Sequence, residues 1–224
     1  MKHNISIFIG SIFLSCVLFM ACGEDDFSEL TANYTSEFCV VQSMNDSSLY
    51  LLTDGGIILN PVSSLDLNGY EENDRLRVTY DDVTGTNSSA LNSKFIRIYG
   101  IQSVLVMDAI SREELTEKVD DPLWIVTNPW IAGGFLNFGF NFQHSDLNIK
   151  HNIFLVNDKY EKDKGVNKLY LTFAHNAKMD RTNTTSSAFA SFRLGSIKHI
   201  NEADSLVISV LEGLIVKTYR IAAE

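Results

Sequence analysis

The sequence has 224 residues, of which 45% are hydrophobic and 11% aromatic, so a sizeable core can form. It carries 28 acidic residues against 18 basic ones, which gives a formal net charge of −10. Nucleic-acid binding depends on lysine and arginine side chains that neutralise phosphates, so this balance argues against a nucleic-acid partner. It also argues against a protein that holds to an anionic membrane surface through basic side chains.

The first residues have the pattern of a secretory signal. Lys2 gives a basic start, an apolar run covers residues 5–20, and Ala21 is a small residue directly before Cys22. A retained membrane span is one alternative, but the run contains serine and glycine and falls short of the roughly 20 apolar residues that spanning requires. A conventional signal peptide is another, but no small-x-small triplet precedes a cleavage site. The pattern is similar to a bacterial lipoprotein signal, so we expect residues 1–21 to be removed and Cys22 to carry a lipid.

A lipid on Cys22 would attach the rest of the chain to a membrane. One acyl chain binds only reversibly, whereas the two or three chains of a bacterial lipoprotein cysteine, such as palmitate, make the anchor permanent. Residues 22–33 form an acidic tether, and the Gly-Glu-Asp-Asp run at 23–26 resembles the export signal of surface lipoproteins in Bacteroidota. A solvated linker is the alternative reading of this run. We expect attachment to the outer membrane, with the protein at the cell surface.

Cysteine usage excludes an intramolecular disulfide in the mature chain. Cys16 leaves with the signal and Cys22 takes the lipid, so Cys39 remains alone. Because Cys39 lies in the apolar stretch 38–41, we expect it to be a small buried residue and not a nucleophile.

Short strands separated by turn signals fill the first half of the mature chain. The expected strands are 34–44, 49–52, 57–59, 75–80 and 95–106. The glycine pair at 55–56 predicts a hairpin between the second and third of these strands. Alternation in the fourth strand places Leu76, Val78 and Tyr80 on the inward face. Gly100, inside the last strand, predicts a bulge or a tight bend of the kind found in small closed barrels.

The second half is again made of strands and shows no sustained helical period. The expected strands are 123–130, 136–142, 151–157, 168–173, 187–194, 205–210 and 213–221. Phe138 and Phe140 belong to the clearest two-residue alternation in the chain. Between the two halves, Ser111 and Glu114 have the spacing of a helix capping box, so one or two helical turns are expected there. Seven strands with turns between them predict an antiparallel sandwich.

Several of these stretches together resemble one known family. They are the lipoprotein start, the hairpin at 51–61, the strand at 75–80, and two later motifs at 136–140 and 169–180. This combination is similar to the NigD-like family of Bacteroidota and covers most of the mature chain. The resemblance implies an all-β fold, with a small OB-like barrel followed by an antiparallel β-sandwich. It implies no established biochemical activity, so no catalytic residue is carried over.

The expected domain boundaries follow from the strands and from this resemblance. They are a signal peptide at 1–21, an acidic tether at 22–33, an OB-like β-barrel domain at 34–110, a linker at 111–121 and a β-sandwich domain at 122–224.

Motifs for chemistry are absent from the sequence. No stretch matches a nucleophile elbow, a phosphate loop, a zinc-binding HExxH helix or an EF-hand, so no catalytic residue, cofactor or metal is predicted. The strongest metal candidate combines His144, Asp146 and His151, but polar residues of a turn explain this group better. The segment 175–180, His-Asn-Ala-Lys-Met-Asp, is expected to be a turn that closes a strand.

Arg75, Arg77, Arg97 and Tyr99 form a candidate ligand-binding patch. We expect these side chains to project from the outward faces of two barrel strands. OB barrels bind ligands across such a face through cations and aromatic rings, and an anionic glycan is the ligand to test. The alternative is that the arginines pair with neighbouring acidic residues on a solvated sheet, in ion pairs worth under about 1 kcal/mol.

The function that these features favour is a surface-tethered, non-enzymatic binding or interaction module with a protein or glycan partner. One alternative is a bacteriocin-associated immunity or envelope-protective lipoprotein, which follows only from the operon that gave the family its name. The other alternative is a hydrolase whose site is assembled from distant residues. A pocket that brings His175 or Cys39 to a carboxylate would favour this last reading.

Overall fold

The computed structural model describes residues 34–223 with the exception of 45–47, 84–91, 147 and 181–183. The predicted signal peptide, Cys22 and the acidic tether lie outside the described residues. Asn33–Glu224 forms one compact unit. Within the part of the chain that the structure describes, no helix has both the length and the apolar character needed to cross a bilayer.

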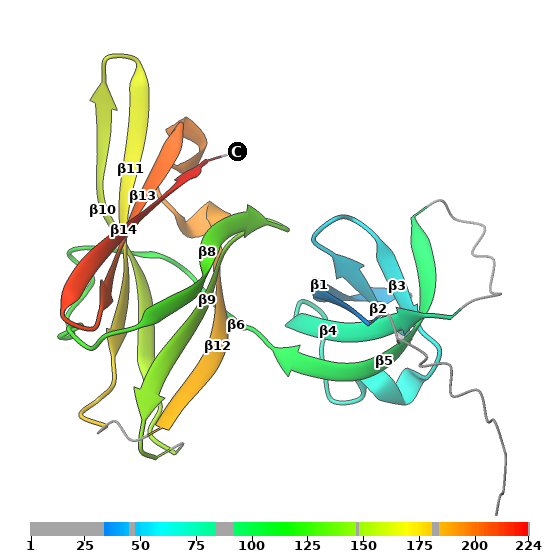
Figure 1. Cartoon of the computed structure of the whole chain (residues 1–224). Helices are drawn as coiled ribbons and strands as arrows, with labels where there is room; N and C mark the ends of the chain where they lie inside the picture. Colours follow the sequence, from blue (N-terminus) through cyan, green and yellow to red (C-terminus); the bar gives the residue numbers. More distant parts are fainter. Residues whose placement is uncertain (1–33, 45–47, 84–91, 147, 181–183, 224) are drawn as a thin grey trace, which may run out of the picture. The chain divides into compact units, whose positions relative to one another are not determined.

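The first five strands close into a barrel (Figure 1). Their bounds are β1 Thr35–Met44, β2 Ser48–Thr53, β3 Ile58–Pro61, β4 Arg75–Asp82 and β5 Ser93–Ser103, with the short 3-10 helix η1 Ser64–Leu67 after β3. The order around the barrel is β1-β2-β3-β5-β4. Strands β3 and β5 run parallel, whereas β1–β2, β1–β4, β2–β3 and β4–β5 are antiparallel.

The barrel core confirms the alternation predicted from the sequence. Leu76, Val78 and Tyr80 are each at most 1% exposed. Cys39 is fully buried beside them, and burial raises the pKa of its thiol to about 12. The thiol is therefore protonated at neutral pH and inert as a nucleophile, as expected.

The bend expected near Gly100 is a β-bulge at the preceding residue. Thr79 of β4 pairs with Gly100, but the next residue, Tyr80, pairs with Ile98. Tyr99 is therefore the extra residue on β5. A bulge increases the local twist of a strand, which helps a short sheet to close on itself.

The remaining strands form two sheets that pack as a sandwich. Their bounds are β6 Leu105–Met107, β7 Ile110–Ser111, β8 Trp124–Ala132, β9 Phe135–His144, β10 Asn152–Asp163, β11 Val166–Asn176, β12 Thr184–Arg193, β13 Ser205–Glu212 and β14 Ile215–Ala222. One sheet has the order β14-β13-β11-β10-β7 and the other β6-β12-β9-β8. The predicted all-β fold, a barrel followed by a sandwich, is confirmed.

Three pairings in the sandwich are parallel, and two of them involve the segment that follows the barrel. Strand β6 pairs with β12 and β7 pairs with β10, while β11 pairs with β13. Residues of the range 34–110, assigned above to the barrel, thus supply β6 and the first residue of β7 to the sandwich sheets.

The expected helix after Ser111 is replaced by a single turn. The backbone N–H of Ser111 donates to Oε2 of Glu114 at 2.6 Å, and the N–H of Glu114 donates to the carbonyl of Ser111 at 3.2 Å. These contacts resemble a capping box, but residues 112–121 contain no helix. A segment this short has no apolar face to bury, and an isolated helical turn is unstable without one.

Aromatic rings fill the space between the two sheets. The rings of Phe138 on β9 and Phe173 on β11 stack with centroids 4.1 Å apart and an angle of 12° between their planes. Phe140 and Phe192 meet Phe173 edge to face. This core holds the ends of β9, β10 and β11 in register, and these ends carry the polar cluster described next.

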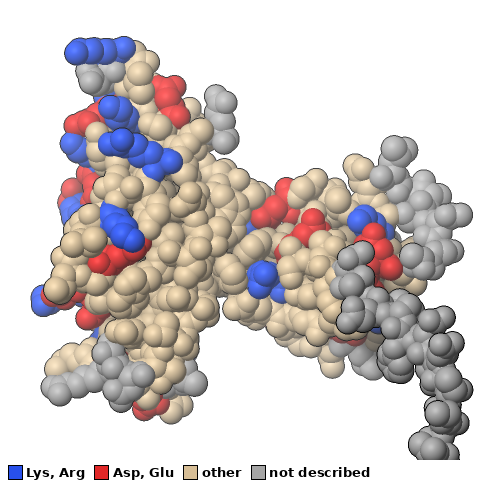
Figure 2. Space-filling model, viewed as in Figure 1, with Lys and Arg blue, Asp and Glu red and all other residues tan. Residues whose placement is uncertain are grey.

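Basic and acidic side chains are mixed around the β10–β11 hairpin. Figure 2 shows blue and red side chains next to one another over this end of the sandwich. Nζ of Lys159 lies 2.6 Å from Glu161, and Nζ of Lys162 lies 3.8 Å from Glu202. The opposite charges compensate each other locally.

Candidate functional site

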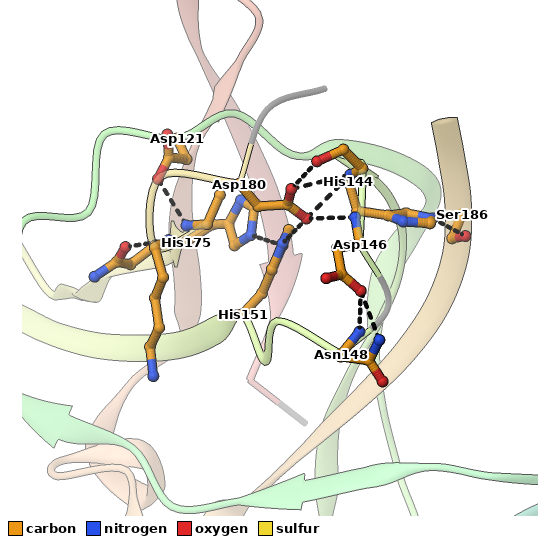
Figure 3. Close-up of polar contacts among 12 residues, drawn as sticks. Asp121, His144, Asp146, Asn148, His151, His175, Asp180 and Ser186 are labelled. Carbon is orange, nitrogen blue, oxygen red and sulfur yellow. Dashed lines mark hydrogen bonds and ion pairs between the residues drawn. The ribbon is translucent and has the colours of Figure 1, made fainter. Parts of the chain in front are cut away.

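Three chain segments bring a cluster of histidines and carboxylates together at the β9–β10 end of the sandwich (Figure 3). His144 ends β9, and His151 directly precedes β10. His175 lies near the end of β11, and Asp180 follows in the next turn. The side chains of His151 and Asp180 are 7% and 1% exposed, so the cluster is almost closed to solvent.

Asp180 is the anionic centre of the cluster. Its carboxylate accepts hydrogen bonds from the backbone N–H groups of Ser145, at 3.0 and 3.1 Å, and of Asp146, at 3.3 Å. The hydroxyl of Ser145 also donates to it, and Nε2 of His151 lies 3.2 Å away. These hydrogen bonds, the Ser145 hydroxyl first among them, hold the pKa of Asp180 well below its ordinary value. Asp180 is therefore ionised and acts as an acceptor only.

Three contacts in series link this carboxylate to the two histidines. The carbonyl oxygen of Pro122 can only accept, so Nδ1 of His175, 3.2 Å away, carries a proton and donates it. Nε2 of His175 lies 2.9 Å from Nδ1 of His151, and Nε2 of His151 faces Asp180. Each contact needs one N–H group, whereas two neutral imidazoles supply only two. All three contacts are satisfied together when the pair holds one additional proton.

His151 is the better place for that proton. Burial, together with the neighbouring ring of His151, lowers the pKa of His175. Nε2 of His151 instead faces the ionised carboxylate of Asp180, which only accepts, so both contacts of His151 need an N–H group of its own ring. Asp180 and His151 therefore form a buried ion pair. A neutral His175 links His151 to the backbone carbonyl of Pro122.

The turn that carries Asp180 has a strained backbone. The N–H of Asp180 donates to the carbonyl of Ala177 at 2.9 Å, and the two residues between them, Lys178 and Met179, have φ values of 51° and 65°. Such turns favour asparagine and glycine, because other side chains crowd the backbone at positive φ. The N–H of Ala177 also donates to Oδ2 of Asp121 at 2.7 Å. A contact from another segment, the carboxylate of Asp121, thus stabilises the turn, as expected where a strained backbone conformation persists.

A cavity of about 390 Å³ lies next to this cluster. Strands of both sheets and the β9–β10 loop contribute to its walls. The lining residues are mostly apolar and comprise Leu105, Phe140, Phe142, His144, Asp146, Ile149, Lys150, His151, Ile153 and Ala188. An apolar cavity of this size with a few polar groups at one side has the character of a small-molecule site.

The polar groups of the cavity are not equally available. Nε2 of His144 lies 2.8 Å from Oγ of Ser186, but Nδ1 of His144 is buried without a hydrogen-bond partner. Oδ1 of Asp146 accepts from the backbone and from the side-chain amide of Asn148, at 2.9 and 2.8 Å (Figure 3). In the described part of the chain Nδ1 of His144 has no partner, but it also has almost no accessible surface, so a ligand would reach it only after a rotation of the ring. Asp146 is held by its own loop.

The described residues of the cluster do not form a catalytic triad of nucleophile, histidine and carboxylate. The hydroxyl of Ser145 donates to Asp180 and not to a histidine, and the Ser186–His144 pair lacks a carboxylate at Nδ1 that would orient the ring. The nitrogens of His151 and His175 are occupied by each other and by other protein atoms. Among the described residues, no group of three or more His, Cys, Asp or Glu could hold a metal ion.

Comparison with known proteins identifies the family. The model for the NigD-like C-terminal beta sandwich domain matches residues 108–219, which is half of the chain. The chain belongs to the NigD-like family. The match contains β8 to β13 and the whole histidine cluster. The sequence matches no curated protein.

Several solved structures share the fold of this NigD-like chain. A NigD-like immunity protein from Bacteroides caccae is 17% identical, with a TM-score of 0.62, and the match covers 85% of this chain and 97% of that one. A Bacteroides fragilis protein that is provisionally named a lipoprotein is 12% identical, with a TM-score of 0.65 and coverage of 85% and 98%. A protein of unknown function from Bacteroides vulgatus is 17% identical, with a TM-score of 0.69 and coverage of 84% and 90%. At these identities the likeness shows the fold alone.

The arginine predicted to begin the ligand-binding patch of this NigD-like protein is buried. Arg75 is 2% exposed and donates to both carboxylate oxygens of Asp54, at 2.9 and 2.8 Å. It also donates to Ser191 at 2.9 Å and to Asn137 at 3.0 Å, and its guanidinium lies 4.2 Å from the ring centroid of Phe135. The expectation of a solvated position is therefore corrected. Alternation placed Arg75 outside the barrel wall, but residues of β9 and β12 cover that part of the wall.

The other members of the predicted patch have different surroundings. The guanidinium of Arg77 lies 5.3 Å from the ring centroid of Phe189. Arg97 is 58% exposed and donates to the hydroxyl of Tyr99 at 3.4 Å, and this hydroxyl donates to Asp81 at 3.0 Å. Arg97 and Tyr99 thus lie together on the barrel surface, whereas Arg75 is buried and does not contribute to that surface. Their role in ligand binding stays a prediction.

Sequence patterns alone do not indicate the histidine cluster. Sequence reasoning interprets His151 as a polar turn residue and the segment 175–180 as a turn that closes a strand, and 24 positions separate His151 from His175. They become neighbours because β10 and β11 form a hairpin in which Ile153 pairs with His175. Counting a regular register backwards from the turn at 164–165 would place His175 opposite Phe154, because the bulge between Asn157 and Lys159, which shifts the pairing by one residue, is not visible in the sequence.

Proposed function

We propose that this NigD-like protein is an outer-membrane lipoprotein that is anchored through Cys22 and binds a ligand at the cell surface without transforming it. The signal-like residues 1–21 before Cys22 support the anchor, and so does the provisional lipoprotein name of the Bacteroides fragilis neighbour. The acidic run at 23–26 supports export to the surface. The lipid anchor connects the protein to the membrane, and the sandwich carries the binding site.

The observation that carries the binding role is the cavity beside the histidine cluster. Its walls are mainly apolar, its volume of about 390 Å³ suits a small molecule, and it contains a buried nitrogen of His144 that lacks a partner. The hydrogen bonds of Asp180 and His151 hold the β9–β10 loop in place around it. Side chains and backbone groups that are already held in this way need not be ordered when a ligand binds.

The same contacts support a binding protein and not an enzyme. A hydrolase needs a nucleophile and a base whose lone pair is free to accept the nucleophile's proton. The described part of the chain places Cys39 in the barrel core as a protonated thiol. The approach of His175 to a carboxylate, which would have favoured a hydrolase, occurs through His151 and without a nucleophile beside it.

A role in immunity is the second candidate. It is favoured by the name of the Bacteroides caccae neighbour, a NigD-like immunity protein with coverage of 97% of its chain. In that case a bacteriocin, and not a small molecule, would be the partner. Deletion of the gene would then sensitise cells to a bacteriocin, and a variant with a filled cavity would still protect them.

Two measurements test the proposal. Intact-mass spectrometry of the protein extracted from membranes should show a chain that begins at Cys22 and carries two or three acyl chains. A chain that retains Met1, or that lacks fatty acid, would refute the anchor. Protease treatment of intact cells should remove the protein if it faces the exterior.

The binding role is tested with a mixed library of small apolar acids, amines and alcohols and ligand-observed NMR. We expect hits with the wild-type protein that disappear in Ala188→Phe, in which the larger ring fills the cavity, and that persist in Val126→Phe, where the substituted side chain is 52% exposed on β8. No hits of any chemical type, or equal hits in both variants, would refute the assignment of the cavity as the binding site.

A further inference from the structure

We infer that the cavity takes a monocarboxylic acid with an apolar body, such as a phenylalkyl or medium-chain alkyl acid. This inference rests on the proposed binding function and specifies its ligand class. The apolar part of the ligand would lie against Phe140, Phe142 and Ile153, and its carboxylate would lie toward Lys150 and His144.

The apolar body follows from the lining. Aromatic and aliphatic side chains of both sheets form most of the wall, so water in the cavity has few hydrogen-bond partners there. Each methylene group transferred from water into such surroundings contributes about 0.8 kcal/mol. A polyhydroxylated sugar would leave its hydroxyl groups unpaired against the same wall, and this cost excludes it.

The carboxylate follows from the charges that border the cavity. Lys150 makes no ion pair and no hydrogen bond with any described residue, in contrast to Lys159 and Lys162 on the nearby hairpin. The acidic residue of the lining, Asp146, already accepts two hydrogen bonds from Asn148. Lys150 is therefore the charged lining residue that has no partner in the described part of the chain.

His144 completes the recognition of an anion. In the tautomer in which the hydroxyl of Ser186 donates to Nε2 of His144, the proton of the ring is on the buried Nδ1. Among the residues that the structure describes this N–H group has no acceptor, and a rotation of the imidazole toward the cavity would bring it to a carboxylate oxygen of the ligand.

The overall acidity of the chain does not prevent anion binding at this position. The net charge of −10 is spread over the whole chain, and at physiological salt the interaction of exposed charges falls off within about 8 Å. Lys150 borders the cavity itself and therefore acts at shorter range than most of the acidic residues. The local charge, and not the net charge, decides which ligand binds.

Isothermal titration calorimetry with phenylbutyrate and phenylbutanol tests the ligand class, because the two probes share one apolar body and differ only in the head group. We expect the acid to bind at least about tenfold more tightly than the alcohol, a difference of roughly 1.4 kcal/mol. Lys150→Gln should weaken binding of the acid about three- to tenfold and leave the alcohol within twofold. Lys162→Gln is the matched control and should change neither probe.

The outcomes separate this inference from the proposed function. If the alcohol binds as well as the acid, or if Lys150→Gln leaves the affinity for the acid unchanged, the ligand class is wrong while the cavity remains a binding site. If neither probe binds and the mixed library also gives no hits, both proposals fail.

Discussion

Nδ1 of His151 lies 2.9 Å from Nε2 of His175, and this contact forces the two imidazoles to share their protons. His175 must donate to the carbonyl of Pro122, so it can only accept from His151 while it is neutral. His151 then needs a second proton for its contact with Asp180. The hydrogen bond between the two histidines joins the residue before β10 to β11, and it places a buried charge beside the cavity.

The protonation states of the pair can be observed directly. At neutral pH we expect a ¹⁵N-resolved imidazole spectrum to show His175 with its proton on Nδ1 only and His151 with protons on both nitrogens. The pKa of His175 should lie below the ordinary value of about 6.5. A spectrum in which His175 carries its proton on Nε2 at neutral pH would contradict the proposed order of hydrogen bonds.

The stability of the protein should fall in two steps as the pH decreases. The pKa of His175 is lowered in the folded chain, so below about pH 6.5 the unfolded chain takes up a proton on this residue that the folded chain does not hold. The free energy of unfolding therefore decreases as the pH falls below about 6.5. The pKa of Asp180 is also lowered, so its stabilising effect is present above about pH 4 and is lost as the pH falls further. Thermal unfolding midpoints from pH 8 to pH 3 measure both steps. His175→Gln should remove the upper step and keep the lower one; an unchanged profile would show that His175 does not cause it.

Replacing Asp180 should disturb the whole cluster. In Asp180→Asn the side-chain amide would confront the N–H groups of Ser145 and Asp146, and the proton on His151 would lose its counter-charge. We expect the thermal midpoint at pH 7 to drop by several degrees. Asp146→Asn is the matched control, because this carboxylate contacts only its own loop, and its midpoint should stay close to that of the wild type.

The buried arginine of the barrel should matter more for stability than its exposed counterpart. Arg75→Met would leave the carboxylate of Asp54 without its guanidinium donor and would remove one of the two donors to Oδ1 of Asn137. Loss of one partner from a buried ion pair costs about 3 kcal/mol or more. Arg97→Met removes an exposed pair and should cost less than about 1 kcal/mol. Urea unfolding of the two variants makes the comparison. Equal losses would contradict the role assigned to Arg75.

Substitutions at two neighbouring glycines test how firmly the Arg75–Asp54 ion pair holds the side chain of Asp54. Both Gly133 and Gly134 have positive φ, so an alanine at either position is strained by about 1 kcal/mol. A Cβ at Gly133 would also lie 2.0 Å from Oδ1 of Asp54, which Arg75 holds in place, whereas a Cβ at Gly134 meets nothing within 4 Å. Gly133→Ala should therefore unfold at clearly lower urea concentration than Gly134→Ala. Matching midpoints would mean that the Asp54 side chain moves away freely.

Much of the fold could be predicted from the sequence because neighbouring residues determine it. Alternation identified the inward faces of β4 and β9, and the glycine pair at 55–56 identified the β2–β3 hairpin, since periodicity and turn chemistry act over a few positions. The capping box at Ser111 shows the limit of such signals. Its hydrogen bonds form, but the helix does not, because a capping signal without an apolar face does not stabilise a helix.

The candidate site could not be predicted in the same way, because its contacts join distant segments. The burial of Arg75 depends on Ser191, which is 116 positions away in the chain. The partners of Asp180 lie 29 to 35 positions upstream. Alternation shows on which side of a strand a residue lies but not which segment covers that side. The unpartnered nitrogen of His144 likewise appears only once the neighbouring strands are in place.

The most direct test of the account is a titration of the full mature chain with phenylbutyrate, followed by methyl and amide NMR. We predict that the largest shift changes fall on Ile149, Ile153, Ala188 and the imidazole of His144, while the barrel core residue Val78 stays unchanged. Shift changes centred on the barrel, or no changes at saturating ligand, would contradict the claim that the sandwich cavity is the binding site.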